Sequence, residues 1–283
     1  MNSMLYLLVS VIAFAVTAVL GKWMIPFLHK LKFGQTIREV GPSWHKSKQG
    51  TPTMGGLMFI LGIAVAMIVC LPVFYSLGID ETLLLKAKAF AGLGMAVAFG
   101  VIGFMDDYIS ILKKRNLGLT ERQKLVLQFA VAAAYLASVA MAGGGTSTII
   151  PFVGQINLGL FYYPLAAVVI VGIVNAVNFT DGIDGLNTTV SFFAFLSLAL
   201  CAGILSMTGL SALGLASAAA CIGFLIWNWH PAKVFMGDTG SLFMGGMVCA
   251  LAFGMDLPIL LLPVGFVYIC EIVSVVLPVS FFK

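Results

Sequence analysis

Residues 175–187 read Asn-Ala-Val-Asn-Phe-Thr-Asp-Gly-Ile-Asp-Gly-Leu-Asn, a polar segment set between two long apolar runs. Asp181 and Asp184 are three positions apart, which places both side chains on one face of a helical turn. Ionisable groups beside a membrane-spanning segment are costly and usually functional. If the preceding run brings this segment to a membrane surface, the two carboxylates can converge on a cation or a substrate.

The composition outside this segment is that of a membrane protein. Of the 283 residues, 61% are hydrophobic and only 9% are charged, and the mean hydropathy is +1.09. A water-soluble domain of this length could not bury so much apolar surface. The apolar residues form continuous runs of about 20, whereas a membrane β-barrel has alternating strands of about ten residues. The sequence therefore predicts an all-α polytopic membrane protein with a single domain, residues 1–283.

Nine apolar runs are long enough to cross ~30 Å of hydrocarbon. We expect spans at residues 3–26, 52–77, 87–105, 124–143, 160–178, 188–207, 210–229, 240–256 and 258–279. Lysine and arginine gather in the loops after the first and third spans. The positive-inside rule makes these loops cytoplasmic and the N-terminus external. Alternation of the spans then places five aspartates on the cytoplasmic face: Asp106, Asp107, Asp181, Asp184 and Asp238.

Residues 146–163 form an external connection with turn residues Pro151 and Gly154, which predicts a short β-hairpin. The five cysteines lie in apolar runs without Cys-x-x-Cys spacing, so we expect neither a disulfide framework nor a cysteine metal site. The histidines are too scattered for a zinc site, and helix-end or surface positions are the simpler interpretation.

Asp106 and Asp107 lie where the third predicted span ends. Adjacent side chains on a helix point about 100° apart. One carboxylate could therefore face a metal or phosphate while the other acts as a base or orients a lysine. The alternative is a solvated helix end that pairs with the basic residues 113–115.

The Asp181 segment does not have the pattern of a calcium-binding EF-hand loop. Positions 3 and 12 of such a loop would be Ile183 and Phe192, which offer no carboxylate. A glycine-rich turn with one aspartate as a helix cap is the remaining structural alternative. Capping explains one aspartate well and two less well, so we favour a functional site.

Residues 228–241, Asn-Trp-His-Pro-Ala-Lys-Val-Phe-Met-Gly-Asp-Thr-Gly-Ser, lead into the eighth predicted span. Gly237 and Gly240 permit close backbone approach, and the free N–H groups of the following helix could face an anion. Asp238 could hold Mg²⁺, a cation usually bound by one or two carboxylates together with substrate phosphates. Taken alone, this motif is also a common capping turn.

The first cytoplasmic loop combines basic residues with the Gly55-Gly56 pair. Pro52 suits the first turn of a helix with Thr51 as its cap, and the two glycines allow another backbone to approach. The lysines of this loop either set the topology or attract a phosphate group.

Together these motifs resemble the polyprenyl-phosphate N-acetylhexosamine-1-phosphate transferases. The resemblance covers residues 34–280, and the stretches 37–56 and 230–238 are most similar to the MraY branch, the phospho-N-acetylmuramoyl-pentapeptide transferases. It implies Mg²⁺-dependent transfer of phospho-MurNAc-pentapeptide from UDP-MurNAc-pentapeptide to undecaprenyl phosphate, giving lipid I and UMP in peptidoglycan synthesis. It also implies a homodimer in the bacterial inner membrane, with the site on the cytoplasmic face and without a nucleic-acid partner.

Matching motif positions give each residue an expected role. Asp238 would be the metal ligand, Asp106 the base that deprotonates or orients the lipid phosphate, and Asp107 its support. Phe235 would stack on uracil. The other residues expected to hold the nucleotide or to line the cleft are Lys48, Thr53, Asn175, Asp181, Gly182, Ile183, Asp184 and Asn228, and weaker candidates for phosphate contacts are Lys114 and Arg122.

The sequence departs from the family pattern at its C-terminal end. The family has ten spans and a histidine-rich cytoplasmic loop before the last one, whereas this sequence stops near the end of the ninth. We therefore expect it to be the ordered part of a longer protein, and the alternative is a truncated protein without activity.

Two other functions compete with this one. A sister enzyme that uses UDP-GlcNAc is the alternative within the enzyme class, and the long first loop and His230-Pro-Ala favour the muramoyl donor. A secondary transporter is the alternative outside it, but its ion site would be expected near the bilayer midplane. The sequence leaves open whether the lipid phosphate attacks directly or a covalent aspartyl intermediate forms.

Overall fold

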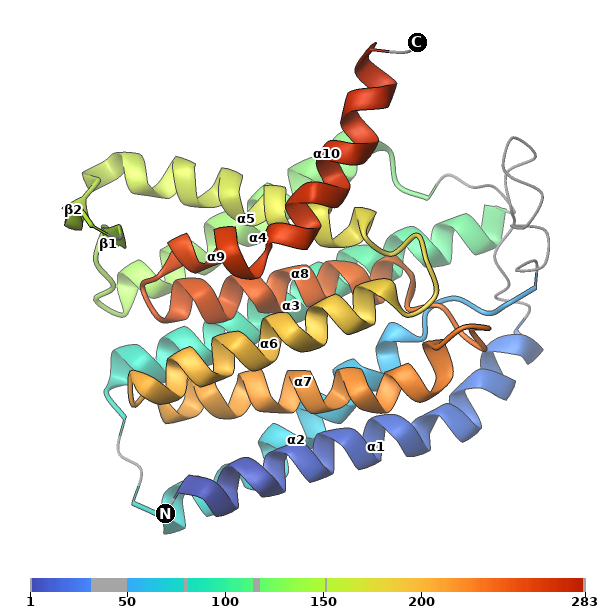
Figure 1. Cartoon of the computed structure of the whole chain (residues 1–283), viewed down its shortest axis with the longest axis horizontal. Helices are drawn as coiled ribbons and strands as arrows, with labels where there is room; N and C mark the ends of the chain where they lie inside the picture. The colour runs from blue at the N-terminus through green and yellow to red at the C-terminus, as the bar shows by residue number, and fades with distance from the viewer. Residues whose placement is uncertain (1, 32–49, 79–80, 114–117, 151, 282–283) are drawn as a thin grey trace.

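Long apolar helices form the framework of the protein (Figure 1). The computed structural model describes residues 2–31, 50–78, 81–113, 118–150 and 152–281. In chain order the elements are α1 (Asn2–Lys30), α2 (Gly56–Ser76), α3 (Leu83–Lys113), α4 (Glu121–Met141), β1 (Ser147–Ile150), β2 (Gly154–Asn157), η2 (Gly159–Phe161), α5 (Tyr162–Phe179), α6 (Leu186–Ile204), α7 (Thr208–Asn228), α8 (Gly237–Gly254), η3 (Pro258–Leu260), α9 (Leu261–Val264) and α10 (Phe266–Phe281).

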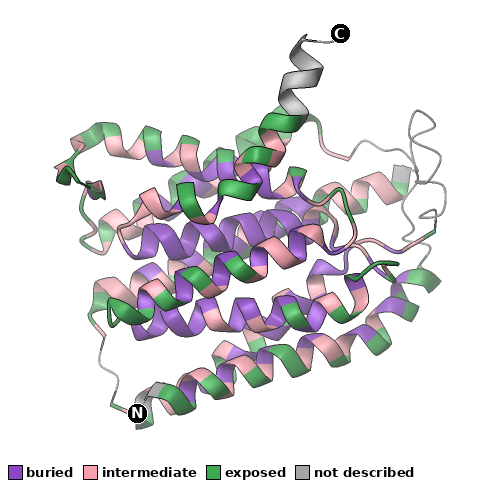
Figure 2. Ribbon diagram, in the orientation of Figure 1, coloured by how far each residue is buried: buried purple, intermediate pink, exposed green. Residues whose placement is uncertain are grey.

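Among the described residues, seven helices, α1 to α7, are long and apolar enough to cross a membrane. The outward faces of the bundle carry large apolar side chains, including Leu7, Trp23, Ile68 and Phe193, each more than half exposed (Figure 2). Such faces would be unfavourable in water but are suited to hydrocarbon. The prediction of an all-α polytopic membrane protein is confirmed.

α8 is the central helix of the bundle and is not one of those seven. Residues 239–254 are all buried, and α8 contacts α2, α3, α5 and α6 (Figure 2). Small residues allow this close packing. Gly245 lies against the backbone of Val174 in α5, and Gly246 lies against Ala96 in α3. The predicted span 240–256 is thus a helix enclosed by protein, and its lower apolar content follows from its many glycines.

Gly103 marks the point where α3 crosses the start of α8. A Cβ atom on Gly103 would overlap the main-chain carbonyl of Asp238, which no side-chain rotation can relieve. We expect Gly103→Ala to lower the thermal unfolding midpoint in detergent and to reduce activity. Gly94→Ala on the same helix is the matched control, because a Cβ atom there meets nothing within 4 Å. Equal midpoints for the two variants would contradict a close α3–α8 crossing.

Three predicted spans differ most from the observed helices. The second was expected to begin at Pro52 with Thr51 as its cap, but α2 begins at Gly56, and the Pro52 carbonyl binds the N–H of Phe235 instead. The third was expected to end at residue 105, but α3 continues to Lys113, so Asp106 and Asp107 lie within it. The last was expected to be continuous over 258–279 but is divided into η3, α9 and α10, and α10 leaves the bundle at an angle (Figure 1). Pro258 begins η3, where a missing N–H is tolerated, whereas Pro263 lies inside α9 and lacks the N–H group that a continuous helix needs there.

The predicted hairpin between the fourth and fifth spans is present. β1 and β2 pair antiparallel, with Ser147 opposite Asn157 and Ile150 opposite Gly154. The Thr146 hydroxyl donates to the Asn157 side chain at 2.7 Å and closes the open end of the hairpin. The hairpin lies at the end of the bundle opposite to the aspartate motifs (Figure 1).

Candidate active site

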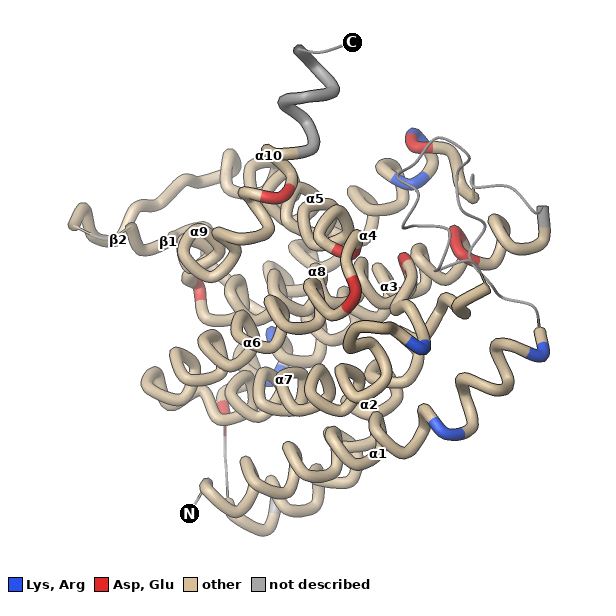
Figure 3. Tube along the Cα trace, turned by 45° about the vertical axis from the view of Figure 1, so that its right-hand side comes forward, with Lys and Arg blue, Asp and Glu red and all other residues tan. Residues whose placement is uncertain are grey.

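The aspartate motifs meet at one end of the bundle, where α3, α5 and α7 end and α4, α6 and α8 begin (Figure 1). Most of the acidic segments of these helices lie at this end, next to basic segments at the start of α4 and before α8 (Figure 3). The prediction that the five aspartates share one face is confirmed. The assignment of this face to the cytoplasm stays a prediction.

Asp107 in α3 caps the N-terminus of α8. Its carboxylate accepts hydrogen bonds from the main-chain N–H groups of Asp238 at 3.2 Å and Thr239 at 2.9 Å. The Thr239 hydroxyl donates to the same carboxylate at 2.7 Å. A carboxylate at a helix N-terminus satisfies N–H groups that have no partner within the helix, and it also complements the helix dipole. Asp107 therefore fixes the first turn of α8, and with it the position of Asp238.

Asp238 lies at the centre of the acidic cluster and is held on both carboxylate oxygens. Lys124 in α4 forms an ion pair with Oδ2. The Asn178 side chain in α5 donates to Oδ1 at 2.9 Å and to the Ser241 hydroxyl at 2.7 Å. Side chains of α4 and α5 thus bind the carboxylate that α8 carries, and this carboxylate remains partly exposed.

Lys124 owes its position to the way in which α4 begins. Thr120 and Gln123 form a capping box, in which each side chain bonds to the main-chain N–H of the other. This start sets the first turn of α4 and directs Lys124 toward α8. Lys124 was not among the predicted site residues. The Thr-x-x-Gln signal at 120–123 predicts where α4 begins, but the contact of Lys124 with Asp238 depends on how α4 packs against α8.

Asp106 lies beside Asp238 and the ammonium group of Lys124. Its Oδ1 accepts a hydrogen bond from the main-chain N–H of Leu119 at 2.9 Å. Gly118 makes this contact possible, because a Cβ atom there would come within 2.8 Å of the Asp106 carboxylate. Asp107 binds the α8 backbone while Asp106 faces Lys124 and Asp238, so the two neighbouring carboxylates have different surroundings. The division of roles predicted for them stays a prediction.

The segment between α5 and α6 places Asp184 against the segment before α8. Asp184 Oδ2 accepts from the main-chain N–H of Ala232 at 3.1 Å and lies 3.0 Å from Nδ1 of His230. The Asp184 side chain is only 5% exposed, whereas that of His230 is 78% exposed. Gly185 then starts α6 with φ +75°, a conformation that favours glycine. Asp184 is thus a link between two segments as well as a predicted substrate group.

The segment before α8 pairs with the segment before α2. The Phe235 N–H donates to the Pro52 carbonyl at 2.9 Å, and the Phe235 carbonyl accepts from the N–H of Gly55 at 2.9 Å. Thr53 consequently lies next to Gly237, where a Cβ atom would be 2.6 Å from the Thr53 hydroxyl oxygen. The structure therefore brings Thr53 and Phe235 to the same end of the bundle as Asp238.

Asn175 and Asn228 were predicted to line the cleft, but their amides bind other protein groups. Asn175 pairs with the buried Gln128 of α4 at 2.7 Å. Asn228 is 2% exposed, accepts from Thr188 at 2.8 Å and donates to the Val234 carbonyl at 3.0 Å. Both side chains therefore position the helix ends around the site. Asn228 is buried, and its amide groups are used for bonds within the protein.

The remaining predicted residues lie at the edge of the site or outside the described part of the chain. Gly182 and Ile183 are exposed in the segment between α5 and α6, and Asp181 is partly exposed there. Arg122 is exposed on the first turn of α4. Lys48 and Lys114 are not among the described residues.

The donor set at this end suits a hard divalent cation. Within the described ranges, no group of three or more His, Cys, Asp and Glu side chains is arranged to hold a metal. Mg²⁺ does not require one, because it is commonly bound by one or two carboxylates, water and substrate phosphates. The Lys124 ammonium group already places one positive charge on Asp238. The carboxylate oxygens of Asp238 and Asp106 are of the ligand type that Mg²⁺ prefers, and an ion there would share Asp238 with Lys124.

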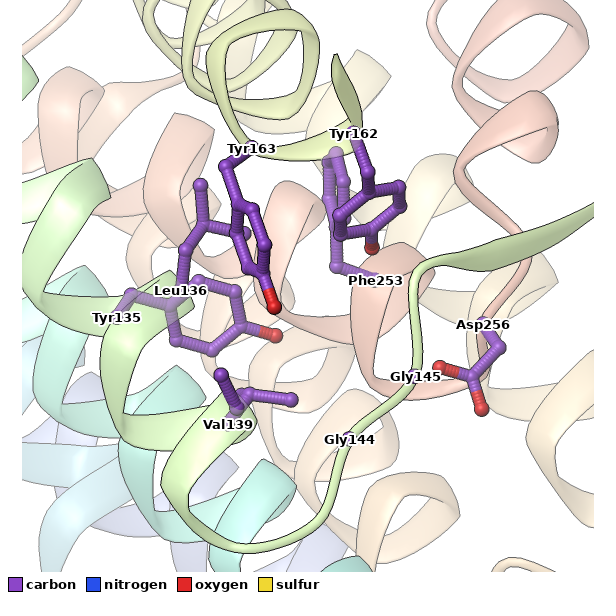
Figure 4. Close-up of a pocket in the computed structure, with 10 residues that line it drawn as sticks. Tyr135, Leu136, Val139, Gly144, Gly145, Tyr162, Tyr163, Phe253 and Asp256 are labelled. Atoms are coloured by element: carbon purple, nitrogen blue, oxygen red, sulfur yellow. The ribbon is translucent and has the colours of Figure 1, made fainter. Parts of the chain in front are cut away.

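A separate pocket lies at the other end of the bundle (Figure 4). Tyr135, Tyr162 and Tyr163 direct their hydroxyl groups into it, with Asp256 at its edge. This pocket lies between the ends of α4 and α8 and the start of α5, remote from the acidic cluster. It is not part of the candidate active site.

A bundle of apolar helices with an acidic cluster and a lysine at one end is consistent with a membrane-embedded glycosyl-1-phosphate transferase, and the comparisons with known proteins identify that class. Residues 89–256 match the family model described as glycosyl transferase family 4. Residues 48–60 match signature 1 of the phospho-N-acetylmuramoyl-pentapeptide-transferases. The family model covers α8 and the segments that carry all five aspartates.

The chain belongs to the phospho-N-acetylmuramoyl-pentapeptide-transferase family. It is 43% identical to a protein of that name from Halalkalibacterium halodurans over 278 residues, 98% of this chain and 83% of the relative. It is 44% identical to that of Clostridium perfringens over 274 residues, covering 96% and 81%, and 44% identical to that of Desulforamulus reducens over 277 residues, covering 96% and 80%. These relatives favour the muramoyl donor over the UDP-GlcNAc alternative.

Proposed function

We propose that the protein transfers phospho-MurNAc-pentapeptide from UDP-MurNAc-pentapeptide to undecaprenyl phosphate, giving lipid I and UMP. The observation that carries this proposal is the convergence of Asp106, Asp107 and Lys124 on Asp238 at one end of a membrane-embedded bundle. A lipid acceptor must stay in the bilayer while its phosphate meets a soluble nucleotide sugar. A polar cluster at the helix ends supplies such a meeting place, and we place it at the cytoplasmic face of the plasma membrane.

The chemistry requires negative charges to approach one another. The acceptor phosphate attacks the phosphorus atom of the donor that carries the sugar, a bond to that phosphorus forms, and the bond to the UMP oxygen breaks. Mg²⁺, when bound by Asp238 with Asp106 beside it, would offset the charge of the diphosphate. The Lys124 ammonium group supplies a second positive charge at the same place. Asp107 keeps the first turn of α8 in position.

We assign Asp106 the task of orienting, and where needed deprotonating, the acceptor phosphate. Its carboxylate is anchored on one oxygen by Leu119 and faces Lys124 and Asp238. The uridine end of the donor is assigned to the segment around Asp181, Gly182, Ile183 and Asp184, with Phe235 for stacking on the base. Thr53, beside Gly237, completes the wall of this cleft. Lys48, Lys114 and Arg122 are proposed as phosphate contacts.

UMP release by the purified protein in detergent, with undecaprenyl phosphate and Mg²⁺, tests the proposal. We expect turnover of UDP-MurNAc-pentapeptide and none of UDP-GlcNAc, and we expect EDTA to stop the reaction. Turnover of UDP-GlcNAc alone would move the protein to the sister pathway. Counter-flow of labelled nucleotide into vesicles without chemical change would instead support transport.

We also propose that the protein is a homodimer. Light scattering after size-exclusion chromatography in detergent should give a protein mass of about twice that of one chain, which is 30.0 kDa. A mass of one chain at all protein concentrations would contradict this assignment.

A further inference from the structure

A chain of buried polar groups connects α10 to the helices around the candidate active site. Tyr268 in α10, Ser191 in α6 and Asn187 in α6 are each 0% exposed. The Tyr268 and Ser191 hydroxyl oxygens are 2.8 Å apart. Ser191 donates to Oδ1 of Asn187 at 3.2 Å. The three side chains form one continuous line of hydrogen bonds through the packed interior.

Asn187 extends this line to two main segments of the site. Its side-chain nitrogen donates to the Val177 carbonyl at 3.1 Å and to the Met236 sulfur at 3.4 Å. Val177 directly precedes Asn178, which binds Asp238. Met236 directly precedes Gly237 and the start of α8. Both ends of the Asn187 amide are therefore used, one toward α10 and one toward Asp238.

The direction of donation along this chain of hydrogen bonds is fixed, because each N–H or O–H hydrogen is donated to one acceptor. Both amide hydrogens of Asn187 are given to Val177 and Met236, so Oδ1 must accept from Ser191. Ser191 then has no proton left for Tyr268, and the Tyr268 hydroxyl must donate to Ser191. Hydrogen bonds in such a series polarise one another, and removing the first leaves a buried oxygen without its donor.

The network joins a helix that leaves the bundle to the turn that carries the central carboxylate. α10 diverges from the other helices beyond Gly265, and its contacts to the bundle lie near its start (Figure 1). Tyr268 is the fully buried residue of this start. α10 packs mainly against α5, and the bond from Tyr268 links it to Ser191 of α6, so these directional hydrogen bonds fix one orientation of α10.

We propose that Tyr268, Ser191 and Asn187 are positioning residues that couple the orientation of α10 to the alignment of Met236, Gly237 and Asp238. The coupling itself is structural, and its catalytic consequence rests on the proposed function. The network touches neither the carboxylates nor Lys124 directly. It acts through Met236 at the entrance of α8 and through the Val177 carbonyl at the end of α5.

Tyr268→Phe tests the network, because it keeps the ring and removes only the hydroxyl group. Tyr135→Phe is the matched control. Tyr135 is also a buried tyrosine, 4% exposed, but it lies at the other end of the bundle (Figure 4). Its hydroxyl faces the separate pocket and is not part of the line through Tyr268, Ser191 and Asn187. Both variants lose the same atom from a buried ring.

Hydrogen–deuterium exchange of the segment 236–241 is the first readout and does not depend on activity. We expect about five- to tenfold faster exchange of the Asp238 and Thr239 amides in Tyr268→Phe, and none of this change in Tyr135→Phe. The second readout is turnover per folded enzyme, with an expected loss of about five- to tenfold in kcat and an unchanged KM for the nucleotide. A merely destabilising substitution would speed exchange throughout the bundle and leave turnover per folded enzyme unmoved, whereas the network predicts a change confined to the segment 236–241.

Ser191→Ala and the double variant complete the test. We expect Ser191→Ala to reproduce the exchange change, and the double variant to add little to either single variant because all three interrupt one line. Unchanged exchange in both single variants would overturn the network. The wild-type protein could release no UMP while Tyr268→Phe and Ser191→Ala still show faster exchange. That result would leave the network standing and overturn the proposed function instead.

Discussion

Asp238→Asn should abolish Mg²⁺-dependent turnover while the protein remains folded. Asparagine keeps the size of the side chain and the hydrogen bond from Asn178, but it removes the charge that holds Lys124 and would hold the metal. The loss of this charge at the reacting phosphates should reduce kcat by about 10³-fold or more. The fold should tolerate the change, because relief of repulsion with Asp106 offsets the lost ion pair.

The measurement combines UMP release with thermal unfolding in detergent at increasing Mg²⁺. A metal that binds the folded protein raises its unfolding midpoint, so the wild type should be stabilised by Mg²⁺ and Asp238→Asn should not. Glu121→Gln is the control, because Glu121 is an exposed carboxylate at the same end of the bundle. Near-normal activity of Asp238→Asn, or an intact Mg²⁺ response, would refute the metal assignment.

Lys124→Met should lower turnover strongly and yet preserve the response to Mg²⁺. Methionine retains much of the aliphatic stem but removes the ammonium group that pairs with Asp238 and lies beside Asp106. The approaching phosphates then lose one positive charge in a partly buried site, for which we expect a kcat loss on the order of 10²- to 10³-fold. Mg²⁺ should bind at least as tightly, because its carboxylate no longer has a competing cation.

Lys30→Met is the matched control for this variant. Lys30 is an exposed lysine in the last turn of α1 and is not part of the candidate site. We expect a change in activity of less than about threefold, as for a solvated surface charge. If Lys124→Met and Lys30→Met behave alike, Lys124 serves topology only, and the role assigned to it here is wrong. If Lys124→Met instead loses the Mg²⁺ response, its charge supports metal binding.

The sequence alone determined the class of the protein and the location of its chemistry. Continuous apolar runs require a bilayer, because every backbone polar group within hydrocarbon must bond inside its own helix. Once the chain crosses and recrosses the membrane, aspartates at alternate helix ends must share one face. The motifs around Asp106, Asp181 and Asp238 could therefore be assigned to one site from their spacing along the chain, and their resemblance to a known family indicated its chemistry.

Only the tertiary structure decided which groups contact one another. Periodicity cannot show that Asp107 caps a helix 130 residues further on, or that Lys124 and not Arg122 reaches Asp238, because both depend on how α3 and α4 pack against α8. The sequence motif also predicted Asn228 as a substrate-binding residue, whereas in the structure its amide bonds to Thr188 and to the Val234 carbonyl. Side-chain contacts between helices depend on their crossing geometry, and that geometry arises from glycines and small residues whose partners lie far away in the sequence.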